Sequence, residues 1–216
     1  MTKEKRVLLL DLICNGVIVL TTVWAIAMFY RTGPDLLGST GNGCFRYFTT
    51  DSNVLAALAA LGLFCCELRQ LRHPDYAVPR WAMALKLVGT VAVTITFLTV
   101  LFFLVPLANW NFAGFFSGNV FVLHGSTPVL CILSLLLLER KPALRRRCIL
   151  LALLPTLVYS VVYLVMVVFV RRWYDWYGFT FGGQYQLIPL VLLVMYAFTL
   201  VLAWAEWKIR GAAEKG

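Results

Sequence analysis

The stretch RRRCILLALLPTLVYSVVYLVMVVFVRR, residues 145–172, decides the fold. Its apolar part, from Cys148 to Val170, contains no charged residue and has arginines at both ends. A helix rises about 1.5 Å per residue, so about 20 apolar residues cross the hydrocarbon core of a bilayer, which is about 30 Å thick. The stretch therefore predicts a transmembrane helix.

Five further stretches have the same apolar character, which predicts an all-α, polytopic integral membrane protein with six transmembrane helices. Hydrophobic residues make up 61% of the chain and charged residues 13%, and the mean hydropathy is +0.83. This composition leaves too little polar surface for a soluble domain, and no gap is long enough to hold one. Residues 1–216 are therefore expected to form one membrane domain. The five stretches cover roughly residues 7–30, 47–68, 81–106, 120–138 and 187–207.

The 19 Lys and Arg residues predict the orientation of the chain, because they alternate between crowded and sparse gaps. Lys and Arg are enriched in cytoplasmic loops, so we expect a multi-pass protein of the cell membrane with both termini in the cytoplasm. The net charge of +9 then follows from topology and anionic lipid headgroups, without a nucleic-acid partner. The sparse face receives Arg31, Arg46, Arg171 and Arg172, and the crowded face receives Lys3, Lys5, Arg6, Arg69, Arg72, Arg80, Lys86, Arg140, Lys141, Arg145, Arg146, Arg147, Lys208, Arg210 and Lys215.

Polar residues near the outer ends of the helices are the first candidates for chemistry, because polar groups are costly at membrane depth. The segment RYFTTDSN, residues 46–53, begins the second helix. Helical spacing puts Thr49, Ser52 and Asn53 on one face, while Asp51 points elsewhere. The alternative is helix capping, in which a threonine hydroxyl accepts a backbone N–H and Asp51 meets the positive end of the helix dipole.

The segment HGSTP, residues 124–128, lies a few residues into the fourth helix. Thr49 and His124 have similar depths from the outer boundary, so they can meet if the second and fourth helices pack together. A hydroxyl and an imidazole at matched depth form a possible nucleophile and base. The alternative is a histidine that only hydrogen-bonds to a neighbouring helix.

The motif F-T-x-x-S-N at residues 48–53, the intramembrane His124 followed by Pro128, the six spans and the length of 216 residues give a family resemblance. The chain resembles the bacterial Pr6Pr family of membrane proteins. That family is distantly similar to the eukaryotic androgen-induced, FAR-17a-like membrane proteins, some of which hydrolyse fatty acid esters of hydroxy fatty acids with a threonine and a histidine. The chain departs from these hydrolases after its histidine, where Gly125 follows directly and Pro128 is four residues away.

The resemblance implies a threonine-dependent hydrolase of lipid esters, with Thr49 as nucleophile and His124 as base. Ser52 and Asn53 would contact the oxyanion or the substrate, and Asp51 would orient the histidine. The partners would be membrane lipids, including a fatty acyl ester substrate. No metal or organic cofactor is expected, since the chain has no Cys-x-x-Cys motif and its two histidines should lie at opposite faces.

Two other functions remain open: a small-solute transporter and a non-catalytic lipid-binding protein. Polar pairs share faces of the first, third and fifth helices and could line a path or only join helices. Aromatic residues of the third and fifth gaps could form a lateral entrance for acyl chains or only an interfacial belt. The polar pairs are Asp11 with Asn15, Thr90 with Thr94 and Tyr159 with Tyr163, and Asp11 is also placed to pair with Lys86; the aromatic residues are Trp110, Phe112, Phe115, Phe116, Trp173, Tyr174, Trp176, Tyr177, Phe179 and Phe181.

Overall fold

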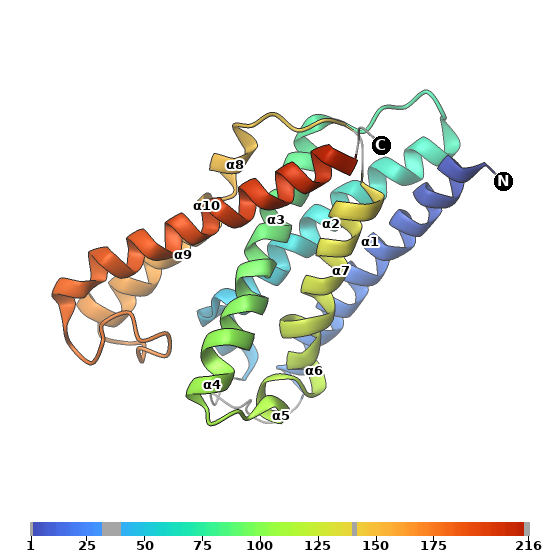
Figure 1. Cartoon of the computed structure of the whole chain (residues 1–216). Coiled ribbons are helices and arrows are strands. Elements are labelled where there is room, and N and C mark those ends of the chain that lie inside the picture. Colours follow the sequence, from blue (N-terminus) through green and yellow to red (C-terminus); the bar gives the residue numbers. More distant parts are fainter. Residues whose placement is uncertain (1, 32–39, 140–141, 214–216) are drawn as a thin grey trace.

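The computed structural model describes residues 2–31, 40–139 and 142–213, and throughout these ranges the ordered elements are helices (Figure 1). Six helical segments are long and apolar enough to cross a membrane, which confirms the all-α fold with six spans. The spans are Lys3–Met28, Phe48–Arg72, Arg80–Leu107, Gly118–Leu138, Cys148–Phe169 and Tyr185–Gly211.

Three spans are single α-helices, and three are built from shorter helices that include π-helical turns. The single helices are α1 (Lys3–Met28), α2 (Phe48–Arg72) and α10 (Ile188–Ala213), the last preceded by η6 (Tyr185–Leu187). The third span consists of α3 (Arg80–Thr99), η2 (Val100–Leu104) and α4 (Val105–Leu107). The fourth span consists of α6 (Gly118–Phe121), η3 (Val122–Ser126), α7 (Thr127–Leu133) and η4 (Ser134–Leu138). The fifth span consists of α8 (Cys148–Leu151), α9 (Leu154–Leu164) and η5 (Val165–Phe169). The connecting helices are η1 (Gly41–Arg46) and α5 (Phe112–Phe115).

The third span is the centre of the bundle. Of its most apolar window, 56% is buried inside the protein, against 11% for the sixth span. One face of α3 packs on α2, and other faces meet α7 and α10. The main apolar core surrounds this helix and includes Leu63, Met83, Leu87, Val91, Leu135 and Ala203.

The fifth and sixth spans lie to one side of the other four. In Figure 1, α9 and α10 run diagonally away from α1, α3 and α7, toward the end of the molecule opposite to the chain termini. The fifth span is interrupted at Ala152 and Leu153, just before Pro155, whose ring and missing N–H disfavour a continuous helix. This divergence leaves room between α2 and α9.

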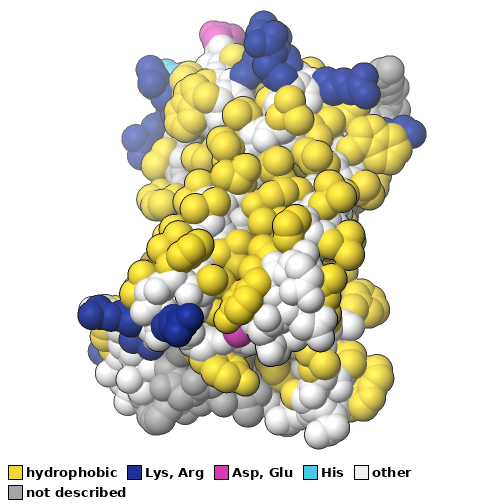
Figure 2. Space-filling view, turned by 90° about the vertical axis from the view of Figure 1, so that its left-hand side faces the viewer, with side chains coloured by type: hydrophobic (Ala, Val, Ile, Leu, Met, Phe, Trp, Pro, Cys, Tyr) yellow, Lys and Arg dark blue, Asp and Glu magenta, His cyan; other side chains and the backbone are white. Residues whose placement is uncertain are grey.

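The start of α1 and the end of α10 lie at the same end of the bundle, which we call the terminal end (Figure 1). Figure 2 shows Lys and Arg side chains gathered there, a second group near the opposite end, and a hydrophobic belt between them. A belt of this kind suits the hydrocarbon core of a bilayer, so the molecule is a multi-pass membrane protein. Three basic residues of the crowded face, Arg140, Lys141 and Lys215, lie outside the described residues.

Gly89 allows α2 and α3 to pack closely. A Cβ atom at Gly89 would lie 2.9 Å from the Cα atom of Ala56, which is closer than atoms pack. We expect Gly89→Ala to lower the free energy of unfolding by about 1–3 kcal/mol through overpacking. The matched control is Gly62→Ala, also inside a helix, where a Cβ would meet nothing within 4 Å and helix propensity favours alanine. Unfolding of both variants in detergent, followed by circular dichroism, tests this; equal stability of the two variants would refute the close contact.

Candidate functional site

A small cavity at the end opposite to the termini is lined by both Thr49 and His124. Its volume is about 70 Å³, which is room for a small polar group and not for an acyl chain. Thr49 is the second residue of α2, whose N-cap is Tyr47, and no side chain caps this helix end. The Thr49 hydroxyl therefore does not cap α2. The lining residues are Phe29, Tyr47, Thr49, Thr50, Leu104, Phe115, Val120, Leu123, His124, Trp176 and Tyr177.

The imidazole of His124 is oriented by a backbone carbonyl. Its Nδ1 atom lies 2.7 Å from the carbonyl oxygen of Phe115, and the rings of Phe115 and Phe116 flank it with centroids 6.1 and 6.2 Å away. A carbonyl oxygen can only accept, so Nδ1 carries the hydrogen. In the neutral ring, Nε2 then holds a lone pair and can accept a proton, which is the requirement for a general base.

The turn that carries His124 is joined to the turn that carries Thr49 through Asn53. In the π-helical turn η3, each N–H bonds to the carbonyl five residues back, as Thr127 does to Val122. Pro128 has no N–H, so the carbonyl of Leu123 lacks its helical donor. The Nδ2 atom of Asn53 donates to this carbonyl at 2.9 Å and to the carbonyl of Thr49 at 2.7 Å.

Ser52 and Asn53, expected near an oxyanion, use their donors within and between helices. Ser52 Oγ is 3.0 Å from the carbonyl of Thr49 and 2.8 Å from Thr96 Oγ1. Both Nδ2 hydrogens of Asn53 have carbonyl partners. These two residues therefore position the start of α2 against the third and fourth spans.

Asp51, expected to orient His124, lines a different cavity, between α2 and α9. The carbonyl of Phe115 holds His124 Nδ1 instead. The two cavities lie on different faces of α2, since Thr49 and Asp51 are two residues apart along the helix.

Tyr177 is a residue of this site that the sequence did not single out, because it looked like one member of an aromatic belt. Burial raises the pKa of Tyr177 to about 12, although hydrogen bonds with Tyr159, the Phe48 amide and the Thr49 side chain act in the other direction. The phenol therefore keeps its proton at neutral pH, and it lines the cavity together with Thr49.

Asp175 folds the loop that carries Tyr177. Its carboxylate accepts from the Tyr163 hydroxyl at 2.8 Å, the Phe179 amide at 3.0 Å, and the amide and hydroxyl of Thr180 at 2.8 and 2.6 Å. Burial acts to raise the pKa of Asp175, but the hydrogen bonds from Thr180, Tyr163 and Phe179 outweigh it and lower this pKa below its usual value of 3.8. The ionised carboxylate is therefore the form that stabilises the loop.

The stabilisation of the loop by Asp175 should depend on pH. Because the folded-state pKa is depressed, the contribution is complete well above pH 3.8 and is lost as the pH falls through the lower folded-state value. We expect aromatic circular dichroism of the loop to be constant from neutral pH down to about pH 5 and to change at lower pH. Asp175→Asn should have the altered spectrum already at neutral pH. Asp75→Asn, at the terminal end, is the control and should titrate like the wild type. If the aromatic spectrum of Asp175→Asn still changes below about pH 5 as that of Asp75→Asn does, Asp175 is not the group that titrates.

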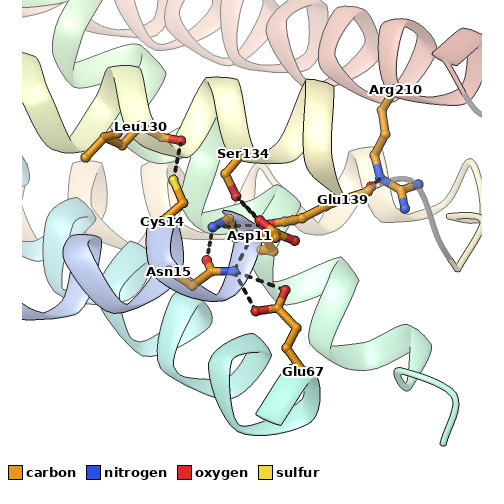
Figure 3. Close-up of polar contacts among 9 residues, drawn as sticks. Asp11, Cys14, Asn15, Glu67, Leu130, Ser134, Glu139 and Arg210 are labelled. Atoms are coloured by element: carbon orange, nitrogen blue, oxygen red, sulfur yellow. Dashed lines mark hydrogen bonds and ion pairs between the residues drawn. The ribbon is translucent and has the colours of Figure 1, made fainter. Parts of the chain in front are cut away.

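A second group of polar side chains is buried near the terminal end, between the first four spans (Figure 3). None of its members is more than 5% exposed. Three carboxyl groups share the group with a single lysine, so full ionisation would leave excess negative charge in a dry interior. The members are Asp11 and Asn15 of α1, Glu67 of α2, Lys86 of α3, Ser134 of η4 and Glu139, which follows η4. We call them the polar cluster.

Lys86 is the centre of the polar cluster. Its Nζ atom lies 3.0 Å from Glu139 Oε1 and donates to Asn15 Oδ1 at 2.5 Å. Asn15 Nδ2 lies 3.3 Å from both carboxylate oxygens of Glu67 and 3.5 Å from Asp11 Oδ1. The predicted proximity of Asp11 and Lys86 is therefore mediated by Asn15, and the ion pair is made with Glu139.

Ser134 lies between two carboxyl groups of the polar cluster. Its hydroxyl oxygen lies 3.0 Å from Asp11 Oδ1 and also hydrogen-bonds Glu139 Oε1. A serine hydroxyl has one hydrogen, so it can donate to only one of these oxygens. Both contacts are hydrogen bonds at the same time only if one of the two carboxyl groups is protonated and donates to Ser134.

Two α10 side chains extend this polar interior. Arg210 donates from Nε to the carbonyl of Glu139 at 2.7 Å and from Nη2 to the carbonyl of Pro142 at 2.8 Å. Thr94 of α3 donates to Glu206 at 2.7 Å, and the other Glu206 oxygen is buried with no partner among the described residues. The sixth span is thus joined to the third and fourth by buried hydrogen bonds.

The sequence predicted that Asp11 and Asn15 share a face near Lys86, but it did not single out Glu67, Ser134 or Glu139. A signal was present: Lys86 lies six residues inside a helix that begins at Arg80. A lysine at that depth requires a partner. Within the described ranges, no three His, Cys, Asp or Glu side chains are arranged to hold a metal ion.

Infrared spectroscopy tests whether a carboxyl group of the polar cluster is protonated. We expect the C=O band of a protonated carboxylic acid at neutral pH, and this band should shift in Ser134→Ala, because its hydrogen-bond partner is removed. Asp11→Asn or Glu139→Gln should remove it. Ser126→Ala, whose hydroxyl bonds to the carbonyl of Val122, is the matched control. A band unchanged by all three cluster substitutions would contradict the assignment.

Comparison with known proteins leaves the resemblance untested, since no family model, no curated protein and no solved structure matches this chain.

Proposed function

We propose that this protein is a threonine-dependent hydrolase of lipid esters, of the class of fatty acid esters of hydroxy fatty acids. The single observation that carries the proposal is that Thr49 and His124, from two different spans, line one cavity. Two further observations support it: the Phe115 carbonyl sets the tautomer of His124, and the Tyr177 side chain lines the same cavity as Thr49.

The reaction would proceed in two steps. His124 Nε2 takes the proton from Thr49 Oγ1 as this oxygen attacks the ester carbonyl, and the alcohol leaves with the proton from His124. Water then gives a proton to His124 and attacks the acyl-threonine, and the fatty acid leaves as Thr49 regains its proton. No cofactor is needed for either step.

The oxyanion would be stabilised by donors at the start of α2. The amides of Thr50 and Asp51 already bond to the carbonyl of Tyr47, at 3.1 and 3.3 Å. The first amides of a helix have no partner within the helix, so we assign the Thr49 amide and the Tyr177 hydroxyl to the developing charge.

The distribution of basic residues supports an orientation with both termini in the cytoplasm of a cell and the Thr49 cavity at the outer leaflet of the cell membrane. A lipid ester at headgroup level would reach this cavity from the bilayer. The lining rings of Phe29, Phe115 and Trp176 suit the apolar groups beside an ester carbonyl.

Hydrolysis of a panel of acyl esters by the purified protein in detergent tests the proposal. Thr49→Ala should abolish turnover and His124→Gln should reduce it by about 10²–10⁴-fold, which is the usual contribution of a general base. Thr49→Ser keeps a hydroxyl and should retain turnover. A fluorophosphonate probe should label the wild type and not Thr49→Ala.

The control is Ser126→Ala, which removes a hydroxyl from the same π-helical turn as His124 and should leave turnover unchanged. Turnover that survives in Thr49→Ala, or its absence from well-folded wild-type protein across the panel, would refute the hydrolase proposal.

A further inference from the structure

The space between α2 and α9 is a second, larger cavity, with a volume of about 350 Å³. Its wall changes in character along the helices. At the end nearest the loops it is lined by Phe45, Trp173 and the Asp51 carboxylate, and deeper in the bundle by aliphatic side chains such as Leu55 and Leu154. The cavity is therefore amphipathic, with its polar end at headgroup level.

Asp51 is the unusual member of this cavity. It is half-buried, and its carboxylate has no hydrogen bond and no ion pair with any residue that the structure describes. It lies in the first turn of α2, where the helix dipole favours negative charge. That partial charge is far smaller than the unit positive charge with which buried carboxylates are usually paired.

Aromatic rings surround the same space. Phe45, Phe48, Tyr159 and Trp173 line the cavity with Asp51, and the rings of Phe48 and Tyr159 are tilted with centroids 5.2 Å apart. Tyr159 is fixed by a hydrogen bond of 2.8 Å from its hydroxyl to the carbonyl of Arg46. Aromatic faces attract alkylated ammonium groups within about 6 Å, and a carboxylate adds a unit of opposite charge.

We propose that this cavity binds a membrane lipid whose headgroup carries an ammonium group. The ammonium lies between Asp51 and the aromatic rings, and the first part of the acyl chain lies along Leu55 and the aliphatic face of α9. The volume equals about 12 waters at about 30 Å³ each, which accommodates an alkylated ammonium and several methylenes.

The lipid cavity is distinct from the Thr49 cavity, although Tyr159 of the first contacts Tyr177 of the second. Phe48 and Tyr159 line the lipid cavity, whereas Thr49 and Tyr177 line the other one. Binding can therefore be measured in Thr49→Ala, in which a bound ester would not be consumed, so failure of one proposal leaves the other standing.

The test is competition in native mass spectrometry of the full chain, as Thr49→Ala, in a maltoside detergent. Lysophosphatidylcholine and lysophosphatidylglycerol with the same acyl chain are added in equal amounts. We expect the choline lipid to be bound preferentially, and Asp51→Asn to weaken its binding by about tenfold, as expected for loss of charge pairing beside a cation–π site. Trp173→Leu should weaken it as well, and Asp75→Asn, an exposed control, should not.

Three results would overturn the proposal. Equal binding of the two lysolipids would show that the ammonium is not recognised. An unchanged preference in Asp51→Asn, with folding verified by circular dichroism, would place recognition elsewhere. Binding of tetramethylammonium alone with the affinity of the choline lipid would show that the ligand is a soluble amine rather than a lipid.

Discussion

The pairing of Lys86 inside the polar cluster is the interaction on which the bundle depends. A buried ammonium costs several kcal/mol of desolvation unless it is paired and hydrogen-bonded. Lys86 meets this requirement through Glu139, directly after the fourth span, and Asn15 of the first, and Asn15 in turn contacts Glu67 of the second. Four spans therefore share one hydrogen-bonded group, and loss of Glu139 would leave the Lys86 ammonium without its ion pair.

Buried polar groups also need hydrogen-bond partners at the end opposite to the termini, where the groups concerned are backbone carbonyls. Proline and π-helical turns deprive carbonyls of their helical donors, and a carbonyl in a membrane interior needs a substitute. Pro128 leaves the Leu123 carbonyl without a helical donor, and Asn53 supplies one from α2. The residue that repairs the backbone also joins the turns of Thr49 and His124, so the irregular fourth helix creates the site rather than disturbing it.

The six spans could be predicted from the sequence because hydrophobicity over about 20 residues is a strong local signal. That Thr49 and His124 line one cavity could be proposed from matched depth, since depth follows from position along a helix. The roles of Ser52, Asn53 and Asp51 could not be predicted, because they depend on how the helices are rotated about their axes. The proximity of Lys86 to Asp11 was predicted, but its ion pair with Glu139 was not, because a charge near a helix end looks the same in a sequence whether it faces headgroups or the interior.

The two ends of the molecule differ in how the helices are held together, and this difference affects where a lipid can enter the bundle. Around Lys86 and Arg210, buried hydrogen bonds join five spans: the first four and, through Arg210, the sixth. At the other end, α9 diverges from the bundle, and the space left beside α2 holds an amphipathic cavity (Figure 1). The Thr49 cavity is too small for an acyl chain, so under the proposed hydrolase function a lipid ester would keep its chains in the bilayer or along the bundle surface. Selection among esters would then depend on the groups beside the carbonyl, where Trp176 and Tyr177 lie, rather than on chain length.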